Sequence, residues 1–175
     1  MARSATKRTT QTTRLNGKRV RIVTTTSATG TTVKVIDPGP KEWELQAAQV
    51  RALRAMPEYA RTVDDVLRGK GQFTLAGDQN AAKRGPKARA EALAAGLTAG
   101  EHDVRIYMIG ARLGLIENKV GNAKLEPSQI VRHPLLAALG FDLQSVCRAT
   151  TCEDAARQAV DIVRTWLAAN DNRQS

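Results

Sequence analysis

The sequence predicts a mixed α/β fold, in which a small central sheet is flanked by helices and preceded by a basic N-terminal arm. Three observations lead to this prediction. Helix-like and strand-like hydrophobic patterns follow one another from residue 42 onward. The composition, 42% hydrophobic with only 3% aromatic residues, supplies a sizeable core made mainly of aliphatic side chains. The positive charge is concentrated near the N-terminus.

The basic arm spans residues 1–41. It carries nine Lys or Arg side chains and a single acid, Asp37, and so holds most of the formal net charge of +10. A basic arm on a nearly neutral body is typical of nucleic-acid binding, although a solubilising tail has a similar composition. Residues 1–17 are polar and Thr-rich, and we expect them to be disordered unless bound. Residues 18–36 contain two β-rich runs around a turn and predict a β-hairpin.

A second domain is expected over residues 42–175, after the break Asp37-Pro38-Gly39-Pro40. Pro57 ends its first helix, Pro127 suits the first position of a later one, and Gly140 suits a C-cap. The patterns predict helices over 42–56, 63–67, 127–139 and 153–169, and strands over 72–76, 104–109, 113–120 and 141–147. Residues 81–95 are expected to form a basic loop that leads into an Ala-rich helix.

The strand over 113–120 contains charged residues in an unusual setting. Its apolar residues form a nearly continuous run, which is typical of a strand covered on both faces. Glu117 and Lys119 lie inside this run, and burying them is costly unless they are paired or coordinated. Because a strand alternates faces, the two side chains point the same way. The alternative is an ordinary solvated strand face.

Asp103 precedes the strand over 104–109. If the two strands pair as a hairpin, Asp103 lies near Glu117, so that two carboxylates and one ammonium converge. Two carboxylates repel each other and a phosphate, but a divalent cation between them reverses this effect. The constellation therefore predicts a Mg²⁺ or Mn²⁺ site suited to attack on a phosphodiester, although the spacing alone often occurs by chance.

A family resemblance rests on these residues. Gly100-Glu101-His102-Asp103 followed by Ile116-Glu117-Asn118-Lys119 resembles the PD-(D/E)XK nuclease motif, and the surrounding sequence is similar to the VRR-NUC branch, particularly its small stand-alone phage and bacterial members. The resemblance covers about residues 42–167. It implies a restriction-endonuclease-like core and a metal-dependent DNA endonuclease.

The resemblance implies specific roles for individual residues. Asp103 and Glu117 match the metal-binding carboxylates, helped by the backbone carbonyl of Asn118, and Lys119 matches the catalytic lysine. Glu42, four residues before Gln46, matches a Glu in the first helix of the family, and we expect it to reach a second metal or a metal-bound water. Gln129 matches the Gln of the family's Ser-Pro-x-Gln pattern, and we expect it to hydrogen-bond the attacking water or a phosphate. The alternatives are a helix N-terminal Glu for Glu42 and an ordinary polar helix position for Gln129.

Two positions depart from the family pattern. His102 stands where the family usually has Pro, and it is expected to shape the turn or to approach a phosphate. Glu126 stands where the family often has a Ser N-cap. Glu interacts favourably with a helix N-terminus, so this replacement is expected to cost at most about 1 kcal/mol.

The nucleic-acid contacts are predicted in a segment with four cations and no acid, just upstream of the Asp103 turn: Lys83, Arg84, Lys87 and Arg89. The alternative is a solvated helix face. The few aromatic residues are scattered, which disfavours a single-strand binder and favours grip on a duplex backbone. The resemblance implies branched or structured DNA such as flaps and four-way junctions, and a homodimer.

The remaining features set the expected compartment. No segment approaches the ~18 apolar residues of a membrane span, and the N-terminus lacks the apolar region of a signal peptide. We therefore expect a cytoplasmic protein of a bacterium or a phage-infected cell, without membrane partners. Cys147 and Cys152 lack the partners of a zinc site and are expected to be reduced. Two other functions remain open: a non-catalytic DNA-binding module on a nuclease fold, and an RNA-directed nuclease.

Overall fold

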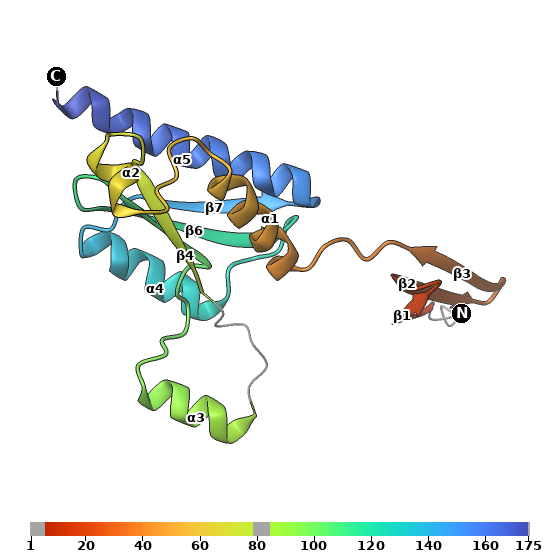
Figure 1. Ribbon diagram of the computed structural model, residues 1–175. Helices are drawn as coiled ribbons and strands as arrows, with labels where there is room; N and C mark the ends of the chain where they lie inside the picture. The colour runs from red at the N-terminus through yellow and green to blue at the C-terminus, as the bar shows by residue number, and fades with distance from the viewer. Residues whose placement is uncertain (1–5, 79–84, 175) are drawn as a thin grey trace. The chain divides into compact units, whose positions relative to one another are not determined.

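The computed structural model describes residues 6–78 and 85–174. The chain divides into two compact units, Met1–Gly39 and Pro40–Ser175. The division falls within the Asp37-Pro38-Gly39-Pro40 stretch. Each unit has its own sheet, drawn in Figure 1.

The first unit is a three-stranded antiparallel sheet of β1 (Lys7–Leu15), β2 (Lys18–Ser27) and β3 (Gly30–Ile36). The predicted hairpin, β2 with β3, is confirmed. The prediction of disorder is wrong for the segment that forms β1, since all nine of its residues pair with β2. Asn16 (φ 49°) and Gly17 (φ 77°) form the two-residue turn between them. This Asn-Gly pair is a strong hairpin signal, and the β-branched threonines around it suit a strand.

The second unit contains a four-stranded mixed sheet in the order β4-β5-β6-β7. Strands β4, β5 and β6 are antiparallel neighbours, whereas β7 runs parallel to β6. The strands are β4 (Phe73–Gly77), β5 (Val104–Met108), β6 (Arg112–Val120) and β7 (Gln144–Ala149), and the helices are α1 (Glu42–Arg54), α2 (Val63–Leu67), α3 (Pro86–Ala94), α4 (Pro127–Ala138) and α5 (Cys152–Gln174).

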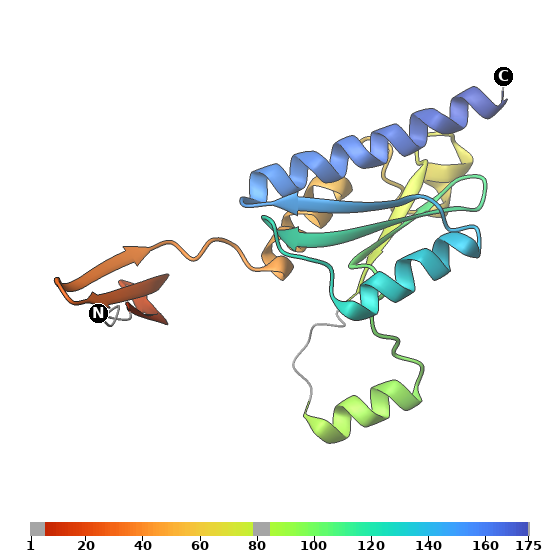
Figure 2. The ribbon, with the colours of Figure 1, turned by 180° about the vertical axis from the view of Figure 1, so that it is seen from behind.

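Helices cover both faces of this sheet. In Figures 1 and 2, α1 and α5 lie against one face and α4 lies along the other. The core comprises aliphatic residues of the strands and of α1 and α5, together with the buried rings of Phe73 and Trp166. Six consecutive residues of β6, 114–119, are buried, which confirms that this strand is covered on both faces. The predicted mixed α/β fold is therefore confirmed.

The predicted elements are present with shifted ends. The last strand begins at Gln144 and not at Phe141, because the ladder with β6 starts where Leu115 pairs with Gln144. Cys147 is buried within β7, Cys152 begins α5, and both are free thiols. Within the described residues, no helix is long and apolar enough to cross a membrane.

Candidate active site

The β5–β6 hairpin brings the first predicted residues together. Its register pairs Val104 with Ile116, which places Asp103, the residue before β5, opposite Glu117. The backbone N–H of Asn118 donates to Asp103 Oδ2 at 2.7 Å, so the carboxylate is tied to the neighbouring strand. The convergence of Asp103 with the Glu-Asn-Lys segment is confirmed.

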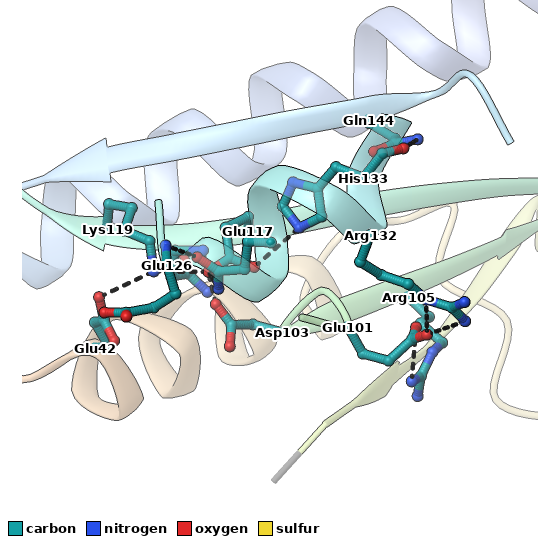
Figure 3. A network of polar contacts seen from close by, with 12 residues as sticks. Glu42, Glu101, Asp103, Arg105, Glu117, Lys119, Glu126, Arg132, His133 and Gln144 are labelled. Atoms are coloured by element: carbon teal, nitrogen blue, oxygen red, sulfur yellow. Dashed lines mark hydrogen bonds and ion pairs between the residues drawn. The ribbon is translucent and has the colours of Figure 1, made fainter. Parts of the chain in front are cut away.

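Glu117 and Lys119 lie on one face of β6 and contact each other. Lys119 Nζ donates to Glu117 Oε1 at 2.9 Å and lies 3.4 Å from Glu42 Oε1, on the first turn of α1 (Figure 3). Glu117 is 1% exposed and Lys119 3%, whereas the Glu42 side chain is about half exposed at 49%. Glu42 thus joins the site through its ion pair with Lys119.

Gln129 reaches the site from α4. Its Nε2 donates to Glu117 Oε1 at 2.5 Å, and its Oε1 accepts from the backbone N–H of Glu126 at 2.8 Å. Both ends of the amide are therefore engaged, and Glu117 Oε1 is held between an amide and an ammonium. A hydrogen bond from Gln129 to a water or a phosphate stays a prediction. Glu126 is the N-cap of α4, the position expected from the sequence.

His133, which was not predicted from the sequence, also contacts the site. Its Nε2 lies 3.8 Å from Glu117 Oε2. Its ring stacks on His102, with centroids 3.8 Å apart and planes 19° apart. A signal was available, because His133 follows Gln129 by four residues and such residues share one face of a helix.

His102 is a buried packing residue. It is 1% exposed, and burial, assisted by the charges of His133 and Arg105, lowers its pKa to about 4. Burial likewise lowers the pKa of His133, against a hydrogen bond to the Gly100 carbonyl. The stack is therefore neutral near pH 7, so His102 contributes no cation for a phosphate.

The carboxylates of the site are strongly perturbed. Burial, together with the negative charge of Asp103, raises the pKa of Glu117 to about 7, although Lys119 and Gln129 oppose the shift. Burial also raises the pKa of Asp103, partly offset by its hydrogen bond from Asn118. Such shifts are common at functional sites.

Lys119 is held in its charged form. Burial alone would lower its pKa, but the hydrogen bond to Glu117 and the charges of Glu117, Glu42 and Asp103 outweigh that effect and raise the pKa. The site therefore contains a fixed ammonium beside three carboxylates, of which Glu117 exchanges its proton near neutral pH.

The turn before Asp103 is held by backbone contacts. The Asp103 carbonyl accepts from Gln46 Nε2 at 2.8 Å and from the backbone N–H of Asp78 at 2.7 Å. Gly100, with φ +88°, packs against α4 so closely that a Cβ would lie 2.5 Å from the Ser128 carbonyl oxygen. Only glycine fits this approach without a shift of the turn.

An ion-pair network ties the same turn to α4 and β5. Arg132 Nε donates to Glu101 Oε1 at 2.6 Å, and Arg105 Nη2 lies 3.6 Å from Glu101 Oε2 (Figure 3). Arg105 also donates to Asp78 Oδ2 at 2.7 Å. This network is not apparent from the sequence, because a contact between Glu101 and Arg132 depends on how α4 packs.

The donors available to a cation are the two carboxylates. Glu117 Oε2 is buried without a hydrogen-bond partner among the described residues. Such an oxygen fits a cation, since a buried polar atom left unpaired is costly. Within residues 6–78 and 85–174, no group of three or more His, Cys, Asp or Glu side chains is arranged as a metal site. Mg²⁺ typically uses one or two carboxylates and completes its shell with waters and substrate phosphates, so Asp103 and Glu117 fit its requirements.

The predicted nucleic-acid residues lie on or before α3. Lys87 and Arg89 are exposed on this helix, and Lys87 Nζ lies 4.0 Å from Glu91 Oε1. Helix α3 has no buried residue. Lys83 and Arg84 lie outside the described residues.

A shallow, largely apolar groove of about 420 Å³ borders the site along α4. It shares Gln129 and His133 with the cluster around Glu117 and reaches Gln144 at the start of β7. The groove therefore begins next to the buried carboxylate.

Comparisons with models of protein families, with curated proteins and with solved structures gave no match to this chain.

Proposed function

We propose that the protein is a metal-dependent nuclease that hydrolyses phosphodiester bonds in DNA. The observation that supports this best is the state of Glu117. One of its carboxylate oxygens is held by Lys119 and Gln129, and the other is buried with no hydrogen-bond partner among the residues that the structure describes. A buried carboxylate pair with an adjacent ammonium suits a cation and a phosphate.

Asp103 and Glu117 would hold the metal ion, Mg²⁺ or Mn²⁺, with the Asn118 carbonyl as a further oxygen ligand. When bound, such an ion supplies a Lewis acid for a phosphate oxygen and lowers the pKa of a coordinated water. The chain prepares this position in advance, since the Asn118 N–H orients Asp103 and Gln129 orients Glu117.

Lys119 would stabilise the negative charge that develops on the phosphate. Its ammonium is buried and stays protonated because two carboxylates, Glu117 and Glu42, lie within 3.4 Å of it. An ordered cation in a site shielded from water stabilises a developing charge more strongly than a solvated one. Glu42, on the exposed side of Lys119, is the acid best placed for a second ion or its water.

DNA is the proposed substrate class because of the charge of the chain and its resemblance to the VRR-NUC branch. The sequence pI is about 10.2, and exposed cations such as Lys87 and Arg89 suit contact with a phosphate backbone. From the resemblance, we propose branched DNA as the preferred form and a homodimer as the active assembly.

The test is a cleavage assay on duplex, flap and four-way-junction DNA, with Mg²⁺, with Mn²⁺ and with a chelator. The variants are Asp103→Asn and Lys119→Gln, and Asp64→Asn on α2, with a 72% exposed side chain, serves as a matched surface control. We expect Asp64→Asn to cleave normally, and each site variant to lose on the order of 10²–10³-fold in rate. Cleavage that survives chelation, or that Asp103→Asn leaves intact, contradicts the proposal.

Binding by the same variants separates a nuclease from a non-catalytic DNA-binding module. Normal DNA affinity with no cleavage by any form of the protein, in either metal, would favour the module. Isothermal titration of Mn²⁺ into the protein gives an independent readout, because Glu117→Gln removes a proposed ligand and should abolish the heat of binding. The same titration curve for both proteins would remove Glu117 from the proposed metal ligands.

A further inference from the structure

The strand register sorts the cations of the first unit onto one face of its sheet. Opposite residues in antiparallel strands share a face, and residues two apart along a strand share it as well. Arg14 pairs with Arg19, Arg8 with Thr25, and Lys34 with Val23. One face, here called the cationic face, therefore carries Arg8, Arg14, Arg19, Arg21 and Lys34.

The opposite face has a different character. It carries two cations, Lys7 and Lys18, among threonines and aliphatic side chains that include Leu15, Val33 and Val35. Three of the aliphatic side chains are more than half exposed, at 55–61%. Neighbouring residues such as Lys7 and Arg8 thus lie on different faces, which the sequence does not reveal without the register.

No acid of the first unit lies on the cationic face. Asp37 is the only acid in residues 1–39, and its Oδ1 accepts from the backbone N–H of Gly39 within its own turn. Arg8, Arg21 and Lys34 are exposed and form no ion pair with any described residue. Arg14 donates to the Gly17 carbonyl at 3.1 Å, which fixes its guanidinium near the turn.

We propose that the cationic face binds the phosphate backbone of nucleic acid, as a site separate from the Asp103–Glu117 cluster. It adds to the proposed nuclease function and does not depend on it, because it requires neither a metal ion nor Glu117. Arginine is well suited to this role, since its planar guanidinium donates two hydrogen bonds to one phosphate.

The dimensions of the face suit a duplex. Arg8 and Arg14 lie six residues apart on β1, roughly 20 Å along the strand, and three strands span roughly 10 Å. Duplex DNA carries one negative charge per about 1.7 Å of its axis. Several phosphates therefore lie within the reach of these cations, and each phosphate neutralised adds about 0.9 to the steepness of the log–log dependence of affinity on salt.

The test measures binding of the full chain to a duplex of fixed length at several salt concentrations, by fluorescence anisotropy in a chelator so that no cleavage occurs. Arg8→Gln/Arg21→Gln removes two charges from the cationic face. Lys7→Gln/Lys18→Gln removes two charges from the opposite face and is the matched control. Arg8→Lys/Arg21→Lys keeps the charge, and thermal unfolding of all three checks that the sheet is intact.

We expect the cationic-face variant to reduce the salt slope by about 1.8 and the control to reduce it by less than about half of that. The lysine variant should keep the slope of the wild-type protein. An equal effect of the two double glutamine variants would show that net charge alone binds the DNA, and would overturn the proposal. The absence of an effect in both would overturn it too.

Two further arms identify the ligand. Duplex RNA of the same length distinguishes RNA from DNA as the source of the phosphates, and a reduced slope on either one supports the proposal. Vesicles of phosphatidylserine and phosphatidylcholine test an anionic membrane. The proposal would be overturned if the cationic-face variant lost vesicle binding while the salt dependence of its binding to both nucleic acids stayed unchanged. The binding assay contains no metal ion and measures no cleavage, so a failure of the nuclease proposal leaves this result readable.

Discussion

Replacing Glu117 with Gln should remove a pH-dependent loss of stability from the metal-free protein. The pKa of Glu117 is raised from 4.5 to about 7 in the folded state, mainly by burial and next by the charge of Asp103. Between these values, the folded state keeps a proton on Glu117 that the unfolded state has released. The stabilising contribution is therefore complete below pH 4.5 and is lost as the pH rises through 7.

The size of this effect follows from the shift. A change from 4.5 to about 7 is about 2.5 pKa units, and each unit corresponds to 1.36 kcal/mol, so the lost contribution is roughly 3 kcal/mol. Glutamine does not ionise, and its carbonyl oxygen can still accept from Lys119 and Gln129. As the pH rises from 4.5 to 7.5, the free energy of unfolding of the wild-type protein should therefore fall by roughly 3 kcal/mol relative to that of the variant.

The assay is urea unfolding of both proteins at half-unit pH steps in a chelating buffer. The difference between the two curves is the informative quantity, because the contribution of His102, which changes with pH in the same range, cancels. Glu91→Gln on α3 is the matched control, since its side chain is 66% exposed, and its difference curve should be level.

A level difference curve for Glu117→Gln would refute the reasoning. It would mean that Glu117 is as well solvated when ionised in the folded protein as in the unfolded chain. A curve that falls with pH would mean that Lys119 overcompensates for burial.

Three further predictions concern packing and protonation. Gly114→Ala should cost about 1–3 kcal/mol, because the new Cβ would lie 2.3 Å from the Trp166 ring, whereas Gly85→Ala, which meets nothing within 4 Å, should change the Tm little. Equal Tm values for the two would contradict the packing. Gly100→Ala should cost on the order of 1–3 kcal/mol, since its φ is +88° and α4 leaves no room for a Cβ; a Tm equal to that of the wild-type protein would show that the turn relaxes freely. The pKa of His102 is lowered from 6.5 to about 4, so the free energy of unfolding of the wild-type protein should fall by roughly 3 kcal/mol relative to that of His102→Phe as the pH falls through that range. Parallel unfolding curves for the two proteins would exclude a buried neutral imidazole.

The β5–β6 hairpin and its charged residues could be predicted from the sequence because the relevant signals are local. Strand alternation places Glu117 and Lys119 on one face without knowledge of the rest of the fold. The apolar residues around them indicate burial, and the short turn at Gly110 brings Asp103 to the same end. Gln129 was proposed from the family resemblance alone.

The first strand was missed because composition was given more weight than turn chemistry. Residues 7–15 are polar and Thr-rich, which is also typical of disorder. The Asn16-Gly17 turn and the β-branched threonines favour a strand, and pairing with β2 satisfies the backbone hydrogen bonds that the segment cannot satisfy by itself. The sorting of the cations onto one face follows from this turn, because a shift by one residue would exchange the two faces.

By itself, the sequence determined the mixed α/β order, the two-unit division and the meeting of Asp103 with Glu117 and Lys119. These depend on neighbours in the chain and on the period of a strand. The tertiary structure decided which groups surround Glu117, because α1 and α4 bring Glu42, Gln129 and His133 from distant parts of the chain. It also decided the protonation of the site, since burial by those helices, and not the identity of the carboxylate, raises the pKa of Glu117 toward neutrality.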